Sequence, residues 1–248
     1  METTIMVRGH HNEMTDKQFT ITRDMIHSIP EPEFTHSWHP IAHKRCDIIY
    51  DTVLAERNIK VFNRSYTMNE KGTEVYAKLI IGDYDQEITS TLIWRNAINK
   101  MFSFGTCGGT HAWACSNLMM FGEFVEFRRH THGVDDDELQ SVVMRGLDKI
   151  LPTLNDMVGW QESLRERKVK VNDVESAAYE ALKVGIVSHH RFAQFDNLLF
   201  GENHSYEPTT VFGFHGACTE TMRDLKMSDG LVKRQRNLKE LIERRWGC

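Results

Sequence analysis

Long apolar runs are missing from this sequence, and their absence excludes several classes of protein. No window of the 248 residues approaches the roughly 18 consecutive apolar residues of a membrane-spanning helix, so we expect no membrane partner. The N-terminus includes Glu2, Arg8 and His10 and has no apolar centre, which is unlike a signal peptide. Cysteine occurs only five times and never as a Cys-x-x-Cys pair, which disfavours a zinc knuckle and a disulfide framework. We therefore expect reduced thiols and a cytoplasmic protein.

An excess of positive charge is also missing. Lys and Arg total 30 and Asp and Glu total 35, which gives a formal net charge of -5 with neutral histidines. A protein that coats nucleic acid through bulk charge would be basic, and an acidic DNA mimic would be far more negative. The content of 40% hydrophobic and 26% charged residues is typical of a folded globular chain. Any binding to nucleic acid must therefore depend on local charge.

The periodicity of apolar residues indicates an α+β fold. A short helix is expected over 46–58, where apolar residues recur every three or four positions. Alternating segments then predict a hairpin-rich antiparallel sheet of five to six strands, with turns at 69–72 and at Gly108-Gly109. Long helices from the C-terminal half are expected to cover this sheet. The expected strands are 59–66, 74–81, 88–95, 101–107, 111–115 and 121–128, and the expected later helices are 135–158, 172–186 and 231–246.

Composition divides the chain into three parts. Residues 1–22 are polar and are expected to form a flexible segment. Residues 23–228 carry the alternating and helical patterns and are expected to form a single α+β domain. Residues 229–248 are expected to form a basic C-terminal helix, because six Lys and Arg residues are accompanied by only two glutamates over 231–246.

Motifs for enzymatic chemistry are weak. The glycine-rich stretch 104–110 does not precede a predicted helix, so a hairpin is favoured over a phosphate-binding loop. His36, His39 and His43 have the spacing of metal ligands, but no His-Glu-x-x-His motif is present. We therefore expect no cofactor, favour a function that is not enzymatic, and keep a metal-dependent hydrolase as the weaker alternative.

Basic residues near the predicted strand ends form a more informative pattern. Aromatic residues, among them Trp94, are interleaved with these cations. Cations that hold phosphates beside rings that stack bases are what a single-strand binding groove requires. The competing interpretation is that the rings fill the core and the charged strand ends face water. The basic residues are Arg95, Lys100, Arg128, Arg129 and His130.

Several motifs follow one another in a recognisable order. They are Ser37-Trp38-His39-Pro40-Ile41-Ala42-His43, Leu92-Ile93-Trp94-Arg95-Asn96, Ala112-Trp113-Ala114-Cys115-Ser116-Asn117-Leu118 and Arg129-His130-Thr131. In this order they resemble a phage/plasmid-like protein family, a domain of unknown function found in phages and conjugative elements. The likeness spans about residues 22–226, although Ala97, Ile98 and Asn99 replace a polar run of the family. The resemblance implies an origin in a mobile element such as a phage, and it implies no reaction.

The leading hypothesis is a phage-encoded, non-enzymatic DNA-transaction protein that binds single-stranded nucleic acid, alone or as a homo-oligomer. Its segment order is similar to that of phage single-strand annealing proteins, which suggests a role in recombination. The alternative is an interaction module that inhibits or recruits a host defence or replication protein. In the leading hypothesis, Arg95, Lys100, Arg128 and Arg129 contact phosphates, Asn96 and Asn117 bond to backbone or sugar, and Trp94 stacks on a base. His130 is a further nucleic-acid-binding residue.

Overall fold

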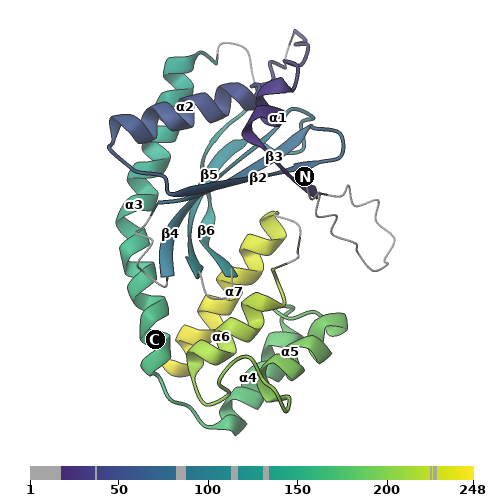
Figure 1. Ribbon diagram of the computed structural model, residues 1–248, viewed down its shortest axis with the longest axis vertical. Coiled ribbons are helices and arrows are strands. Elements are labelled where there is room, and N and C mark those ends of the chain that lie inside the picture. Colours follow the sequence, from purple (N-terminus) through teal and green to yellow (C-terminus); the bar gives the residue numbers. More distant parts are fainter. Residues whose placement is uncertain are drawn as a thin grey trace. The chain divides into compact units, whose positions relative to one another are not determined.

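The structure, a computed structural model, has the α+β architecture expected from the sequence (Figure 1). It describes residues 18–36, 38–81, 88–112, 117–130, 134–223, 225 and 228–248, without the side chains of 112, 117–127 and 229. The chain divides into two compact units. The first unit lies within 1–84, 91–108 and 124–152, and the second lies within 85–90, 109–123 and 153–248.

The sheet has six strands that lie side by side in chain order, which is a meander. β1 to β4 pair antiparallel, and the register places Tyr66 opposite Ala77 and Ala77 opposite Trp94. The predicted antiparallel sheet is therefore confirmed. The strands are β1 (Gln18–Ile21), β2 (Asn63–Asn69), β3 (Glu74–Ile80), β4 (Ile88–Ala97), β5 (Phe104–Ala112) and β6 (Asn117–Arg128).

Details of the sheet differ from the expectation. Residues 18–21, inside the segment expected to be flexible, form β1 and pair with β2. The hairpin expected at Gly108-Gly109 is wrong, because both glycines lie within β5. Neither is among the glycines with the positive φ that a two-residue hairpin turn requires. The connection from β5 to β6 falls at 113–116, outside the described residues.

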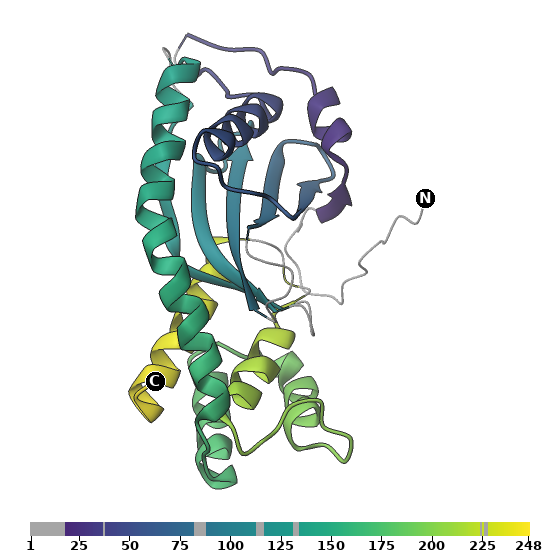
Figure 2. The same ribbon diagram turned by 60° about the vertical axis from the view of Figure 1, so that its left-hand side comes forward.

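Helices α1 (Arg23–Ser28) and α2 (His43–Glu56) lie on one face of the sheet (Figures 1 and 2). Apolar residues recur every three or four positions along α2, so one side of the helix is buried. Tyr50 Oη lies 2.6 Å from Thr106 Oγ1, and this hydrogen bond attaches α2 to β5. The buried residues in this repeat are Cys46, Ile49, Tyr50 and Val53.

One buried carboxylate connects α1, α2 and β2. Asp47, on α2, is only 1% exposed. Its Oδ2 accepts a hydrogen bond from Arg23 Nε at 2.6 Å and lies 2.8 Å from His27 Nε2. Its Oδ1 accepts a hydrogen bond from the Tyr66 hydroxyl at 2.9 Å. These three partners replace the water that the carboxylate loses on burial.

The second unit is mainly helical. Phe214, on α6, makes edge-to-face contacts with Phe195 and Trp246, with ring centroids 6.1 and 5.3 Å apart. The basic C-terminal helix expected from the sequence is α7, which contacts α4 and α6 and belongs to this unit. The helices are α3 (Asp136–Glu166), which runs through both units, α4 (Val171–Lys183), α5 (Phe192–Phe200), α6 (Val211–Glu220) and α7 (Asp229–Trp246).

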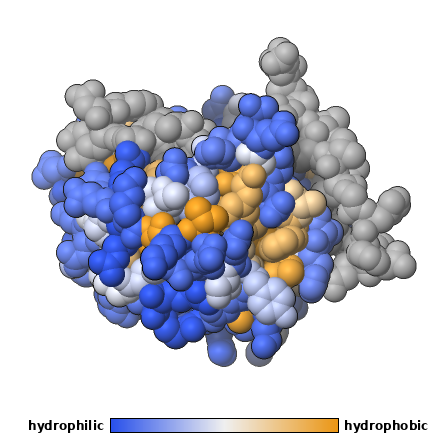
Figure 3. Space-filling view, turned by 90° about the horizontal axis from the view of Figure 1, so that it is seen from below, coloured by the Kyte–Doolittle hydropathy of each residue, from blue (hydrophilic) through white to orange (hydrophobic). Residues whose placement is uncertain are grey.

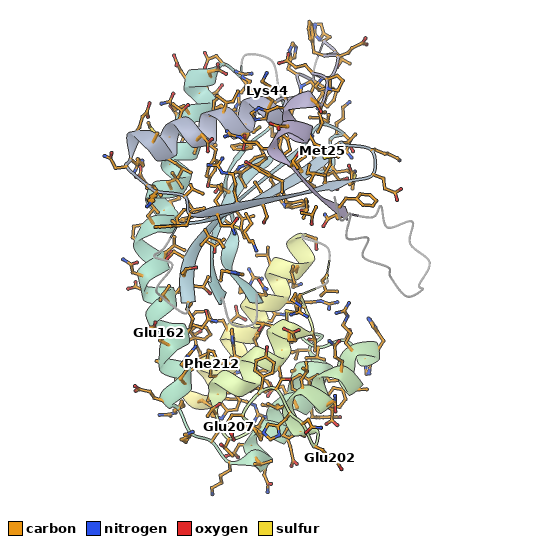
Figure 4. The ribbon with its side chains drawn as sticks, viewed as in Figure 1. Met25, Lys44, Glu162, Glu202, Glu207 and Phe212 are labelled. Carbon is orange, nitrogen blue, oxygen red and sulfur yellow. The ribbon has the colours of Figure 1, made fainter. Side chains whose placement is uncertain are left out.

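Cationic side chains cover aromatic rings in the second unit. Arg165 Cζ lies 4.3 Å from the ring centroid of Phe212, which is labelled in Figure 4. Lys239 Nζ lies 5.2 Å from the ring centroid of Trp160.

On the face drawn in Figure 3, apolar side chains occur in groups between hydrophilic ones, which is typical of a surface that faces water.

Candidate nucleic-acid interface

The sequence-predicted stacking residue, Trp94, is fully buried in the first unit. Its ring centroid lies 6.3 to 6.5 Å from those of Tyr50, Tyr66 and Phe104. Consecutive residues of β4 are buried, so both faces of this strand are covered around Trp94. The prediction that Trp94 stacks on a base is therefore wrong, and its ring is part of the core.

Arg95 and Asn96 are buried beside it, at 5% and 0% exposure. The guanidinium carbon of Arg95 lies 4.9 Å from the ring centroid of Phe102. Asn96 Nδ2 donates to the Ile41 carbonyl at 2.8 Å and lies 3.0 Å from His43 Nδ1. The prediction that Arg95 and Asn96 contact nucleic acid is wrong, because both side chains are enclosed by the protein.

His130 is also buried, and it positions the chain around residues 39–41. Its Nδ1 accepts a hydrogen bond from the Ile41 N–H at 2.7 Å, and its carbonyl accepts one from the His39 N–H at 3.1 Å. Burial lowers the pKa of His130 to about 4, so the ring is neutral at physiological pH. The prediction that His130 binds nucleic acid is therefore wrong, because its side chain is enclosed by the protein.

The other predicted site residues differ from one another in exposure and in pairing. Arg128 Nη2 forms an ion pair with Glu138 Oε2 at 2.9 Å, so its charge is balanced within the first unit. The side chain of Asn117 lies outside the described residues. Lys100 and Arg129 are exposed. Of the predicted cations, Lys100 and Arg129 are therefore the best placed to meet a ligand.

Sequence reasoning missed a turn that carries exposed rings. Phe34 is 73% exposed, and its ring stacks on that of His39 with centroids 5.0 Å apart and planes 15° apart. Backbone hydrogen bonds between Thr35 and Trp38, of 2.8 and 3.3 Å, close the turn. We call Phe34, Trp38 and His39 the aromatic turn. The signal was available, because Pro30, Pro32 and Pro40 mark an irregular segment, and such segments often carry binding residues.

The aromatic turn contacts the side chain of one exposed cation and the backbone next to the other. Lys100 Nζ lies 5.0 Å from the ring centroid of Trp38. Lys100 also has a φ of 69°, in the left-handed region that favours glycine. Arg129 directly precedes His130, whose carbonyl bonds to His39. Residues that are distant in sequence therefore place the ammonium group of Lys100 against the half-buried Trp38 ring, and the backbone beside Arg129 against His39.

A cavity of about 370 Å³ opens beside the aromatic turn. Phe34 and His39 line it on one side, and Glu31 and Asp135 contribute carboxylates. Arg45 also lines it, and its guanidinium is held in place by hydrogen bonds to Asp136 and to the Val134 carbonyl. Lys44, labelled in Figure 4, is an exposed cation in the same first turn of α2.

The three histidines with ligand-like spacing do not gather into a metal site. His39 stacks on Phe34, whereas His43 places Nδ1 near Asn96 and Nε2 3.2 Å from the Gly72 carbonyl. Burial lowers the pKa of His43 to about 4. Within the described parts of the chain, no group of three or more His, Cys, Asp or Glu residues is placed to hold a metal ion.

Comparisons with other proteins identify no relative. No family model, curated protein or solved structure matches this chain. The resemblance to the phage/plasmid-like family therefore stays a prediction. None of the helices that the structure describes is long and apolar enough to span a membrane.

Proposed function

We propose that the chain binds single-stranded nucleic acid through a surface of the first unit that consists of the aromatic turn, Lys100 and Arg129. The observation that carries the proposal is the exposed Phe34 ring, which is already held in a stack by His39. Bases of any sequence have a flat face that can extend such a stack. The nearby cations supply the attraction to phosphates that stacking alone does not.

The stacked rings reduce the cost of binding a base. His39 is fixed by its backbone hydrogen bond to His130, and Phe34 rests on the His39 ring. A ring that is positioned before the ligand arrives loses little conformational freedom when a base stacks on it. Phe34 is exposed at 73% in the absence of a ligand, so a stacked base would also cover apolar surface.

The charge on this surface is local. The whole chain carries -5, so attraction to phosphates must come from cations that have no carboxylate partner. Lys100 lies against the Trp38 ring, and a cation on an aromatic face keeps its full charge. Lys100 and Arg129 are two exposed cations, and this small number favours a short contact with one strand over the coating of a long polymer.

The biological setting is part of the proposal. The sequence resemblance supports a phage origin and a role in a DNA transaction such as recombination or annealing, with a homo-oligomer as the assembled form. The competing hypothesis of a module that binds a host protein would use the same exposed rings. Binding to oligonucleotides distinguishes the two.

The test is fluorescence anisotropy with a labelled 12-nucleotide single strand at two salt concentrations. Phe34→Ala is expected to weaken binding by about 5- to 100-fold, because stacking contributes about 1–3 kcal/mol per base. Lys100→Gln is expected to reduce the slope of log affinity against log salt by about 0.7, which is one phosphate contact on a single strand.

Matched controls are present in the same unit. Lys60 Nζ lies 4.8 Å from the ring centroid of Phe62, just beyond the far end of α2, so Lys60→Gln removes a similar cation–ring pair away from the interface. Met101→Ala removes an exposed apolar side chain next to Lys100. Wild-type affinity in Phe34→Ala, or binding that ignores salt, would rule the proposal out.

A further inference from the structure

We infer that the cavity beside the aromatic turn binds one unstacked nucleobase that carries an exocyclic amino group, such as cytosine or adenine, in preference to thymine or uracil. This inference rests on the proposed function. The cavity of about 370 Å³ falls in the range of small-ligand pockets, roughly 300–1,000 Å³. It shares Phe34 and His39 with the proposed interface, so a strand stacked there can place its next base inside.

Part of the cavity wall is apolar and offers a surface to a flat ring. Pro32, Pro40 and Val134 contribute apolar surface, and the Phe34–His39 stack contributes a ring surface. A nucleobase has two apolar faces and a polar edge, so it can use both the rings and the polar groups of such a pocket.

The polar groups of the cavity determine which polar edge of a nucleobase can bind there. Glu31 and Asp135 are carboxylates, which accept hydrogen bonds but donate none. Asp135 Oδ1 accepts from the Glu138 N–H at 2.8 Å, which leaves Oδ2 for a ligand. An exocyclic amino group donates to such oxygens, as in the pairing of Glu or Asp with cytosine N4. Thymine and uracil present a carbonyl at that position, and it would repel the carboxylates.

Arg45 complements the two acceptors. Its Nε bonds to Asp136 and its Nη2 donates to the Val134 carbonyl at 2.8 Å, so the guanidinium is held rigidly. Nη1 can donate to a ring nitrogen or carbonyl of the base. A phosphate is a poor occupant, because Asp136 already balances the charge of Arg45 and two more carboxylates line the cavity. The cavity therefore fits a neutral ligand with donors and acceptors on one edge.

The experiment compares two 12-nucleotide strands, one of thymidine only and one with a single central cytidine. The full chain is expected to bind the cytidine strand at least about tenfold more tightly, which is the lower end of the contribution of one hydrogen bond to a charged group. The double variant Glu31→Gln, Asp135→Asn is expected to lose this preference and keep its affinity for the thymidine strand. Asparagine remains a good N-cap, so α3 should not be disturbed.

The matched control is Glu33→Gln, an exposed glutamate in the same segment that does not line the cavity. It should keep the cytidine preference. Equal affinity of the wild type for both strands would overturn this inference and leave the proposed function in place. Failure of the wild type to bind either strand would overturn both.

Discussion

Asp47 illustrates how much a single buried group can hold together. Its carboxylate takes hydrogen bonds from Arg23 and Tyr66 and contacts His27, so it joins two helices and a strand of the first unit. A buried charge is tolerated only when partners replace water. Here two of the partners, Arg23 and His27, lie on α1, and the third, Tyr66, lies on β2. Removal of the carboxylate would take an acceptor from the buried Tyr66 hydroxyl and a partner from Arg23 and His27, of which Arg23 keeps Asp51.

Asp47→Ala is therefore expected to lower the free energy of unfolding by about 1.5–3 kcal/mol, the range for hydrogen bonds to a charged group. Denaturant unfolding followed by circular dichroism measures the effect. Asp148 provides the comparison, because its 58% exposed side chain pairs with Arg57 at 2.6 Å on the surface. Asp148→Ala should cost less than about 1 kcal/mol. Similar losses for both variants would contradict the structural role of Asp47.

At the scale of elements, the strand and helix types could be predicted from periodicity, whereas the accessibility of their side chains could not. β4 was recognised as a strand, but its polar residues were expected to be exposed. The contiguous apolar run Leu92-Ile93-Trp94 is typical of a strand covered on both faces, and that signal argued for burial. Burial of Asn96 depends on the start of α2 and on Ile41, and burial of Arg95, on the opposite face of the strand, depends on Phe102. The positions of these partners depend on tertiary contacts.

The candidate interface could likewise be predicted only in part from the sequence. Lys100 and Arg129 were identified from charge near strand ends, and both are exposed. Their aromatic neighbours were not identified, because the contact between Lys100 and Trp38 links residues that are far apart in sequence. The turn at Gly108-Gly109 was misplaced because glycine fits both a tight turn and an extended strand.

At the scale of the whole molecule, charge is largely balanced within each unit. In the second unit, Arg245 Nε pairs with Glu180 Oε2 at 2.8 Å, and Arg244 pairs with the same carboxylate. Hydrogen bonds from Arg244 and Arg245 hold the pKa of Glu180 below its ordinary value. The basic helix α7 is thus partly neutralised by α4, and the proposed interface in the first unit does not depend on it.

Three buried histidines give the molecule a predicted dependence on pH. Burial lowers the pKa of His43, His130 and His215 to about 4, from an ordinary value of 6.5. The unfolded chain takes up protons near pH 6.5, whereas the folded chain does so only near 4. Stability is therefore complete above pH 6.5 and falls as the pH drops towards 4, by at most about 1.4 kcal/mol per pH unit for each histidine.

Unfolding free energies measured between pH 7 and pH 5 test this expectation, because Glu180 with its lowered pKa still stays ionised in that window. Proton NMR supplies a second readout, in which the three imidazole rings should not titrate above pH 5. Stability that is constant across the window, or a ring that titrates near 6.5, would contradict the burial argument.

The left-handed backbone of Lys100 predicts that one substitution will raise stability and lower affinity for oligonucleotide. Relief of its φ of 69° by Lys100→Gly is expected to raise the free energy of unfolding by about 1 kcal/mol, since glycine adopts this conformation without a steric penalty. The same change removes a cation from the interface, so calorimetry should find a more heat-resistant protein that holds oligonucleotide less well. A variant that became more stable and also bound more tightly would contradict the proposed role of Lys100 in binding.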